Sequence, residues 1–449
     1  MKVPLLSIEE RKTTFKEVEL GFTKEQALSE ANRCLQCSAP SCVKGCPAGV
    51  NIPNFIKAFR EGDIDKAVGI IREKNFFPSI CGRICQHEKQ CEGSCVLAKT
   101  KEGAICIGGI ERFIGDNSPY PSRRNLVGKN VAIVGSGPSG LAVAAYLSLI
   151  GIHVTVLEGT NTFGGVIKYG VPEFRLPKDI VAKELSRLQD LGIDFEPNAK
   201  INEESLEQLA KRYDAVFIGT GVGKSKMLDI PGSGLKNIVS AMKFLVNLNQ
   251  SGLTMISPGE KVVVIGAGYV GIDAARSAIR LGGDVTCLTM GTEEQLLLRM
   301  SIKDYEESKE EGVKFIFEIK VKEFLGNEKV EKVVYENHAR GELEATKVVF
   351  AIGQEHDDDD SLKAPLKTNK TGCIEINEKH QTVISNVFAA GDCVHGPKTV
   401  IQAIDSGRKA AQAIIKFLDK KIADEAMGIK NINEPDKVTQ KIDTTNKDI

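Results

Sequence analysis

The residues best suited to chemistry in this sequence are its cysteines, because nine of the twelve lie within residues 34–106. Thiolates are the ligands that soft metal centres prefer. Two groups of four stand out, spaced C-x2-C-x4-C-x3-C-P and C-x3-C-x5-C-x3-C, and their members are Cys34, Cys37, Cys42, Cys46, Cys81, Cys85, Cys91 and Cys95. Two [4Fe–4S] clusters require eight ligands, and two groups of four supply eight.

The spacing leaves two questions open. Four thiolates can also hold a structural zinc ion, so a pair of zinc sites is the alternative to two iron–sulfur clusters. Cys46 precedes Pro47, and in two-cluster ferredoxins the cysteine before proline binds the other cluster. Cys46 is therefore a candidate for joining the second group.

A glycine-rich turn follows the cysteines. The apolar strand predicted at 131–134 leads into Gly135-x-Gly137-x-x-Gly140, then a helix, then a second strand that ends at Glu158. This is the complete dinucleotide fingerprint, in which the glycines admit a pyrophosphate at the helix N-terminus and the acid binds ribose hydroxyls. We include the intervening Pro138 and Ser139 in the predicted site.

A second fingerprint, Gly266-x-Gly268-x-x-Gly271, also follows an apolar strand and opens a helix. Two such units about 130 residues apart predict two bound nucleotides. At the end of the next strand, residues 289–292 include no acid for a ribose 2′-hydroxyl and no arginine pair for a 2′-phosphate, although Arg299 could reach. The sequence therefore leaves NADPH and NADH both open.

Two further segments are predicted to contact ligands. The segment FGGVIKYGVPEFRLPK contains Gly164, Gly165 and Gly170, and its many apolar residues favour an ordered loop. Near the end of the chain, Asp392 follows a predicted strand and turn, and a helix is expected to open near Thr399. This arrangement would place a carboxylate and a helix N-terminus beside a second dinucleotide.

Length, charge and cysteine content limit the possible number of domains, the partners and the compartment. At 449 residues, two or three domains are expected. Lysine plus arginine number 59 and aspartate plus glutamate 60, so the charge indicates neither nucleic acid nor an anionic membrane as a partner. We find no secretory signal and no apolar run of about 18 residues. We therefore expect a cytoplasmic protein, in which dense cysteines favour metal ligands over disulfides.

Hydrophobic periodicity and the positions of glycine and proline predict the helices and boundaries that position these residues. Residues 50–75 are predicted to be helical and to separate the two cysteine groups, and the Pro-containing segment 117–128 marks a first domain boundary. The aspartates at 357–360 are expected in a solvated loop, and residues 421–449 are expected to form a flexible tail.

Taken together, the motifs resemble the small-subunit family of glutamate synthase. That family includes the electron-input half of dihydropyrimidine dehydrogenase, the large subunit of NADH-dependent ferredoxin:NADP oxidoreductase and stand-alone NADPH oxidoreductases. The resemblance covers roughly residues 25–420, and the motifs that carry it are CxxCxxxxCxxxCP, CGRICxxxxxCEGSC, IGGIERF, GSGPSGL, FGGVIKYGVPEFRLPK, DAARSAIRLG and AAGDCVHGPKTVIQAI.

The resemblance implies an α/β fold in which a helical iron–sulfur domain precedes two Rossmann-like domains, the second inserted in the first. The implied boundaries are 1–120 for two [4Fe–4S] clusters, 128–225 with 385–420 for FAD, and 226–384 for NAD(P)H. It also implies that the backbone around Thr399 to Ile401 faces the flavin ring, and we include Gly391, Asp392, Thr399 and Val400 among the predicted cofactor-binding residues. Two departures are Met290 with Gly291, where NADPH-dependent members carry arginines, and Tyr269, where asparagine is common.

The ligand sets implied by the resemblance cross between the two cysteine groups. Cys95 would join the first three cysteines on one cluster, and Glu111 would complete the other. Cys81 and Cys106 would then be spare, whereas a plain count of the spacing makes Cys81 a ligand instead of Glu111. The implied sets are Cys34, Cys37, Cys42 and Cys95 for one cluster, and Cys46, Cys85, Cys91 and Glu111 for the other.

The expected function is electron transfer from NADPH, with NADH as the alternative donor, through FAD and the two clusters to an acceptor such as ferredoxin. Hydride transfer to a flavin needs no protein acid or base, so we nominate no catalytic residue. Neither fingerprint unit contains C-x-x-C, which argues against a thioredoxin-reductase-like disulfide relay. The alternatives are an electron-input subunit that serves a separate catalytic subunit, and a non-enzymatic zinc protein.

Overall fold

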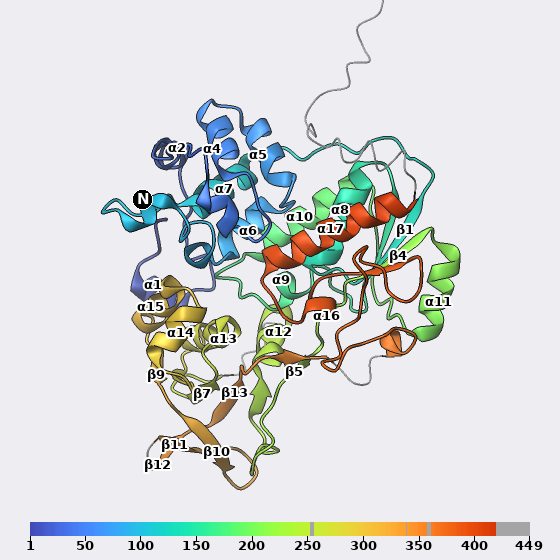
Figure 1. Cartoon of the computed structure of the whole chain (residues 1–449). Coiled ribbons are helices and arrows are strands. Elements are labelled where there is room, and N and C mark those ends of the chain that lie inside the picture. The colour runs from blue at the N-terminus through green and yellow to red at the C-terminus, as the bar shows by residue number, and fades with distance from the viewer. Residues whose placement is uncertain (252–255, 338, 357–360, 419–449) are drawn as a thin grey trace, which may run out of the picture.

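A computed structural model of the chain describes residues 1–251, 256–337, 339–356 and 361–418 (Figure 1). The aspartates at 357–360 and the predicted tail at 421–449 lie outside the described residues. The described part divides into a helical N-terminal unit and two units built on parallel sheets, which is the fold class expected from the sequence.

The N-terminal unit is made of short helices. Residues 50–75 form two helices rather than one, because Gly62 adopts a positive φ of 85° between them. The elements of the unit are α1 (Ile8–Thr13), α2 (Lys24–Asn32), α3 (Ser41–Gly45), α4 (Ile52–Arg60), α5 (Ile64–Arg72), α6 (Pro78–Ile84), η1 (His87–Lys89), η2 (Val96–Lys99) and α7 (Ile107–Asn117).

Helices α6 and α7 approach each other closely, and glycines make this possible. A Cβ atom on Gly82 would lie 2.5 Å from the backbone nitrogen of Arg112. A Cβ on Gly115 would lie 2.5 Å from the backbone nitrogen of Ser79. The glycines of both helices therefore fix the position of α7, which carries Glu111, against α6, which carries Cys81.

The first sheet unit has five parallel strands in the order β15-β4-β1-β2-β3. Strand β15 pairs with β4 in this sheet but follows it much later in the sequence, so the residues between the two strands include an inserted unit. Its elements are β1 (Asn130–Val134), α8 (Pro138–Leu149), β2 (His153–Leu157), α9 (Val166–Tyr169), α10 (Lys178–Asp190), β3 (Asp194–Glu196), α11 (Glu203–Arg212), β4 (Ala215–Ile218), β15 (Val387–Ala389), α16 (Asp392–His395) and α17 (Val400–Leu418).

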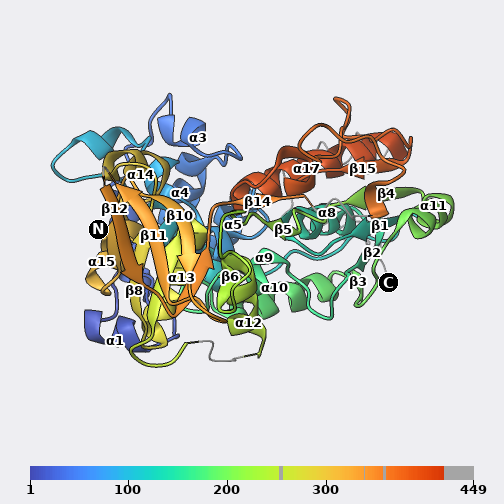
Figure 2. The same ribbon diagram turned by 90° about the horizontal axis from the view of Figure 1, so that it is seen from below.

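The inserted unit contains a second parallel sheet in the order β6-β13-β7-β8-β9. A three-stranded antiparallel sheet extends from it, and a short antiparallel pair, β5 with β14, lies where the chain enters and leaves the insertion (Figure 2). Its elements are β5 (Lys224–Ser225), β6 (Ile238–Ser240), α12 (Ala241–Ser251), β7 (Lys261–Ile265), α13 (Tyr269–Arg280), β8 (Asp284–Leu288), α14 (Glu293–Arg299), α15 (Ile302–Glu310), β9 (Lys314–Ile316), β10 (Lys320–Leu325), β11 (Lys332–Asn337), β12 (Ala339–Glu344), β13 (Lys347–Phe350) and β14 (Gln354–Glu355). The short helix η3 (Ser361–Lys363) follows the insertion and packs against α11 of the first sheet unit.

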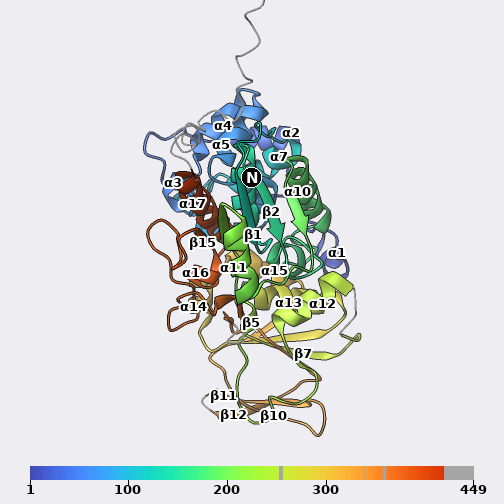
Figure 3. The ribbon, with the colours of Figure 1, turned by 90° about the vertical axis from the view of Figure 1, so that its right-hand side faces the viewer.

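The three units pack against one another. Helix α1 lies beside α13 and α15 of the inserted unit, away from the other N-terminal helices (Figure 3). Buried residues of α4 to α7 belong to the same apolar core as those of α8 and α17. The N-terminal unit therefore rests on both sheet units. Among the described helices, none combines the length and apolar character needed to cross a membrane.

Candidate functional site

Four cysteines from both sequence groups line one pocket. Cys34, Cys37 and Cys42 lie around it with Cys95, and apolar residues of α4 close its inner side. Burial raises the pKa of Cys42 to about 11, and the neighbouring thiols of Cys95 and Cys34 add to this rise. Sulfur atoms around a cavity suit a four-thiolate cluster, which neutralises their mutual repulsion when it binds.

The second gathering consists of Cys46, Cys85, Cys91 and Glu111, of which Cys91 and Glu111 are buried. Burial raises the pKa of Cys46 to about 11, with smaller contributions from the charges of Glu111 and Cys85. Burial likewise raises the pKa of Cys91 well above its usual value, and Glu111, Cys46 and Cys85 contribute through their charges. These four side chains therefore lie close enough to influence one another. They are the second set that the resemblance implies.

Both candidates for the last ligand lie beside this second set. The thiol of Cys81 is fully buried and hydrogen-bonded to that of Cys85, which raises the pKa of Cys85 well above its usual value. Burial also raises the pKa of Glu111 to about 7, and the carboxylate accepts a hydrogen bond of 2.7 Å from Asn75 Nδ2. The geometry thus leaves Cys81 and Glu111 as alternatives.

Two residues that the sequence did not single out shape these centres. Asn75 is fully buried and orients Glu111, although nothing in the local sequence marks it. Gly45, at the end of α3, has no room for a side chain, since its Cβ would lie 2.2 Å from Ser94 Oγ and 2.6 Å from the carbonyl oxygen of Gln90. This contact brings the segment between Cys91 and Cys95 against α3.

The described residues contain no group of three or more histidine, cysteine, aspartate or glutamate side chains positioned to hold a single metal ion. The thiols of the first set surround a pocket instead.

The first glycine turn has the geometry that a pyrophosphate requires. Gly135 has φ of 98°, and a Cβ on Gly140 would lie 2.1 Å from the carbonyl oxygen of Gly135. Gly137 is the N-cap of α8, and its Cβ would meet only one atom, at 3.8 Å. The turn is therefore tight inside and open at Gly137, where a ligand can approach the backbone.

Several predicted residues converge on this turn. A Cβ on Gly165 would lie 2.9 Å from the Cα of Gly137, and a Cβ on Gly391 would lie 2.6 Å from Ser139 Oγ. Pro138 occupies the first turn of α8. The structure therefore brings the loop at 164–170 and the turn at 391 next to the first fingerprint.

The acid at the end of β2 is held in place by a serine that the sequence analysis missed. Ser136 Oγ donates a hydrogen bond of 2.6 Å to Glu158 and accepts one of 3.1 Å from the backbone of Gly164. Ser136 stands inside the fingerprint as the residue between Gly135 and Gly137. Its position in a buried turn beside an acid is a signal that could have identified it.

The segment from Asp392 to the start of α17 forms the other side of the predicted flavin site. Burial raises the pKa of Asp392 to about 6, although the backbone nitrogen of Lys398 donates to its carboxylate at 3.2 Å. Helix α17 opens at Val400, after Thr399, whose backbone nitrogen donates to Gln402 Oε1. A Cβ on Gly407 of this helix would lie 2.3 Å from the carbonyl oxygen of Ser139, so α17 runs against the first fingerprint.

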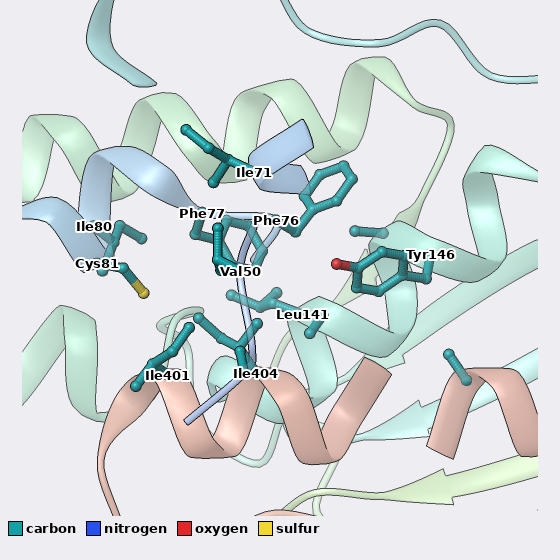
Figure 4. Close-up of a cluster of buried hydrophobic side chains, with 14 of the residues drawn as sticks. Val50, Ile71, Phe76, Phe77, Ile80, Cys81, Leu141, Tyr146, Ile401 and Ile404 are labelled. Atoms are coloured by element: carbon teal, nitrogen blue, oxygen red, sulfur yellow. The ribbon is translucent and has the colours of Figure 1, made fainter. Parts of the chain in front are cut away.

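The second gathering of cysteines lies beside the start of α17. Figure 4 shows Cys81 of α6 facing Ile401 and Ile404 of α17, with Val50 and Leu141 between the units. The buried thiols and the predicted flavin site are thus neighbours across one apolar contact.

The second glycine turn repeats the first. Gly266 has φ of 102°, and a Cβ on Gly271 would lie 2.0 Å from the carbonyl oxygen of Gly266. A Cβ on Gly268, the N-cap of α13, would meet no atom within 4 Å. Tyr269 follows, and its hydroxyl accepts a hydrogen bond of 2.7 Å from the backbone nitrogen of Ser301.

The residues expected to choose the nucleotide are exposed. Met290, after β8, is 80% exposed. Arg299 is also exposed and ends α14, two residues before the backbone group bound by Tyr269. The arginine therefore stands near the second turn.

Comparison with known proteins matches the two parts of the chain separately. Residues 11–121 match the family model described as dihydropyrimidine dehydrogenase domain II, 4Fe-4S cluster. Residues 129–407 match the model described as pyridine nucleotide-disulphide oxidoreductase.

Relatives match over nearly the whole length. The glutamate synthase [NADPH] small chain of Azospirillum brasilense is 34% identical over 454 residues, which cover 92% of this chain and 93% of the relative. The NAD-dependent dihydropyrimidine dehydrogenase subunit PreT of Escherichia coli O157:H7 is 33% identical, over 90% of this chain and 97% of the relative. FprA of Mycobacterium tuberculosis, solved with NADPH, shares the fold with a TM-score of 0.54 at 20% identity, over 68% of this chain and 90% of FprA.

Proposed function

The chain belongs to the family of the glutamate synthase small chains and is an NAD(P)H oxidoreductase with an iron–sulfur domain, and we propose that it transfers electrons from NADPH to an acceptor such as ferredoxin. FAD would bind the first sheet unit, NADPH the inserted unit, and two [4Fe–4S] clusters the N-terminal unit. When bound, the flavin accepts a two-electron hydride and releases single electrons to the clusters.

One observation carries this proposal. The eight cysteines of the two groups lie in two gatherings, and the second gathering lies beside the start of α17, where the flavin is expected. Cys95 stands with Cys34 and Cys42, which supports ligand sets that cross between the groups.

The protein's own residues would bind and orient the nucleotides. The backbone at Gly137 and Gly268 would accept the pyrophosphates, each at a helix N-terminus. Glu158 would bind ribose hydroxyls, and the N-terminus of α17 would stabilise negative charge near Thr399. Arg175 joins the two sheet units, since it donates to Asp273 at 2.8 Å and lies 3.3 Å from Asp304.

The test uses the intact chain, purified and handled without oxygen. We expect the iron of two four-iron clusters, about eight atoms per chain, one FAD, and bleaching of both flavin and cluster absorption by NADPH. Ferredoxin should then be reduced. A colourless protein that contains zinc instead of iron would contradict the proposal, as would a flavoprotein that NADPH and NADH both fail to reduce.

The preference for NADPH rests on residues 289–292, which present no acid to repel a 2′-phosphate, and on the position of Arg299. Changing Arg299 to Ala should raise the KM for NADPH and leave the KM for NADH unchanged. Equal increases in the KM for both nucleotides would show that Arg299 does not bind the 2′-phosphate.

A second candidate function is electron input to a separate catalytic subunit of a glutamate synthase or related dehydrogenase. The observation that favours it is the match over 93% of the length of a glutamate synthase small chain. Purification from the native source distinguishes the two. A large subunit in fixed stoichiometry would support this candidate, and a lone chain that reduces ferredoxin efficiently would support the first.

A further inference from the structure

We propose that the mouth of the pocket lined by Cys34, Cys37, Cys42 and Cys95 is the docking surface for a small acidic electron-carrier protein. This inference rests on the proposed function, because it names the place where electrons leave the chain. Four observations lead to it: the order of the two sulfur gatherings, the helix between them, the apolar rim of the pocket, and its charge.

The two gatherings differ in their distance from the predicted flavin and in their exposure. Cys81 and Cys91 of the second gathering are 0% and 6% exposed and share an apolar core with α17. Cys46 and Cys85 of the second gathering are partly exposed, as are the cysteines of the first, but only the first gathering lines a pocket that reaches the exposed side chains of Leu35 and Val96. Electrons that start near α17 would therefore meet the gathering beside that helix first and the one at the pocket second.

Helix α3 connects the two gatherings. Cys42 lies within α3 and faces the pocket, while Cys46 follows the helix and belongs to the second set. The backbone nitrogen of Cys46 donates to the carbonyl oxygen of Cys42 at 3.0 Å. One helical turn thus separates a ligand of each set, and α3 lies near the edge of the molecule in Figures 2 and 3.

The pocket opens between two exposed apolar side chains. Leu35 is 61% exposed and Val96 is 49% exposed, and both line the pocket next to a candidate ligand. A partner protein can bury such side chains, and apolar residues at the centre of an interface bring two redox centres together without intervening water.

The two segments that carry the pocket's cysteines are rich in cations. Residues 33–45 and 93–101 contain Arg33, Lys44, Lys99 and Lys101 and no aspartate or glutamate, although Glu92 and Glu102 bound the second segment. The three lysines are exposed, and within the described part of the chain none of them pairs with an acid. Arg33 is paired with Glu30 at 2.6 Å, so the unpaired charge comes from the three lysines. An apolar centre flanked by three unpaired lysines is complementary to an acidic carrier, which the charge would also steer into place.

The experiment reverses this charge in the intact holoprotein. The variant carries Lys44→Glu, Lys99→Glu and Lys101→Glu. Its matched control carries Lys200→Glu, Lys211→Glu and Lys370→Glu, which change the net charge equally at exposed lysines of the sheet units. Lys211 lies on α11, at the opposite end of the molecule from α2 and α4 in Figure 1. Iron content and visible spectra verify that both variants keep their clusters.

NADPH-dependent reduction is then measured with an acidic two-cluster ferredoxin, a basic c-type cytochrome and the neutral quinone menadione. We expect the rim variant to lose at least about tenfold in kcat/KM for the ferredoxin and to lose its dependence on salt. The cytochrome should be reduced faster and menadione at an unchanged rate, and the control variant should behave as the wild type.

Failure of the proposed function and failure of the docking surface would give different results in these assays. Wild-type protein that NADPH cannot bleach, and that reduces no menadione, would overturn the proposed function. Normal menadione reduction with an unchanged kcat/KM for ferredoxin in the rim variant would overturn the docking surface alone. Equal losses in the rim and control variants would do the same, as would a large subunit found seated on Leu35 and Val96.

Discussion

At the scale of single residues, the open question is the last ligand of the second sulfur set. Glu111 and Cys81 both lie beside Cys85, but they differ in their surroundings. Asn75 Nδ2 donates a hydrogen bond of 2.7 Å to the carboxylate, and Asn75 also bonds to the thiol of Cys81, whose first hydrogen-bond partner is the thiol of Cys85. The bond of 2.7 Å gives the carboxylate of Glu111 a fixed orientation, which a metal ligand requires.

We therefore predict that Glu111→Ala loses one of the two clusters, seen as a fall to about half the iron and a change in the low-temperature EPR spectrum of the reduced protein. Cys81→Ala should keep both clusters, because its methyl group fits the same apolar site with a small loss of volume. The opposite pattern would make Cys81 the ligand. Loss of a cluster in both variants would show that the site tolerates neither change.

Much of the chemistry at this scale could be predicted from the sequence. Both glycine turns have the shape that the fingerprint predicts, since Gly135, Gly140, Gly266 and Gly271 are each confined by backbone atoms. The spacing alone could not pair Cys95 with Cys34, because that contact joins segments about 60 residues apart. The resemblance to a family supplied that pairing. Asn75 was missed because its role comes only from a tertiary contact, whereas Ser136 lies between two glycines of the fingerprint and could have been identified from that position.

At the scale of elements, the short helix α3 determines whether the two cysteine groups interleave. Its last residue, Gly45, touches Ser94 and Gln90, so any side chain there would push away the segment that carries Cys91 and Cys95. The sequence pattern gives no reason for this glycine, because the helix it ends and the segment it touches are far apart in the chain.

We predict that Gly45→Ala disturbs both clusters although it alters no ligand. A Cβ 2.2 Å from Ser94 Oγ is well inside contact distance, and overpacking of this kind costs about 1–3 kcal/mol. The expected result is a lower iron content and faster bleaching in air. Adding Ser94→Gly should restore part of the iron, since Ser94 supplies the closest atoms, whereas Gln90 would still be crowded. A single variant with normal iron would show that α3 can shift without cost.

At the scale of the whole molecule, a buried ion network joins all three units. Arg276 and Arg280 of α13 bind Glu311 at 2.6 and 2.7 Å, and Arg280 Nε donates to the carbonyl oxygen of Thr14 in the N-terminal segment. The guanidinium of Arg280 also lies 3.7 Å from the ring centre of Phe174, in the first sheet unit. The inserted unit is therefore anchored to both of its neighbours through one side chain.

Nothing in the sequence could predict this network, because its members come from segments up to about 300 residues apart. Arg11 of α1, for example, donates to Glu310 at 2.7 Å. Ordinary helix patterns explain why α1 and α15 form, but their charged residues have the composition of solvated faces. Only the packing of α1 on α13 shows that Arg11, Glu307 and Glu311 are buried, while Glu310 stays exposed.

Glu311 is the central carboxylate of this network, and its replacement tests how far the network holds the units together. The side chains of Glu311 and Arg280 are both 0% exposed, so Glu311→Gln would leave Arg280 without its buried counter-charge, whereas Arg276 keeps Glu307 at 3.0 Å. Breaking such a pair costs about 3–5 kcal/mol, because the remaining charge stays desolvated. We expect a clearly lower urea midpoint for the inserted unit, followed by circular dichroism. Lys261→Met breaks the exposed pair with Asp284 and should cost less than about 1 kcal/mol. If the two variants were equally stable, the network would not hold the units together. If Glu311→Gln alone also slowed the reduction of flavin by NADPH while iron and FAD contents stayed normal, the anchoring of the inserted unit would be part of how the two nucleotides are brought together.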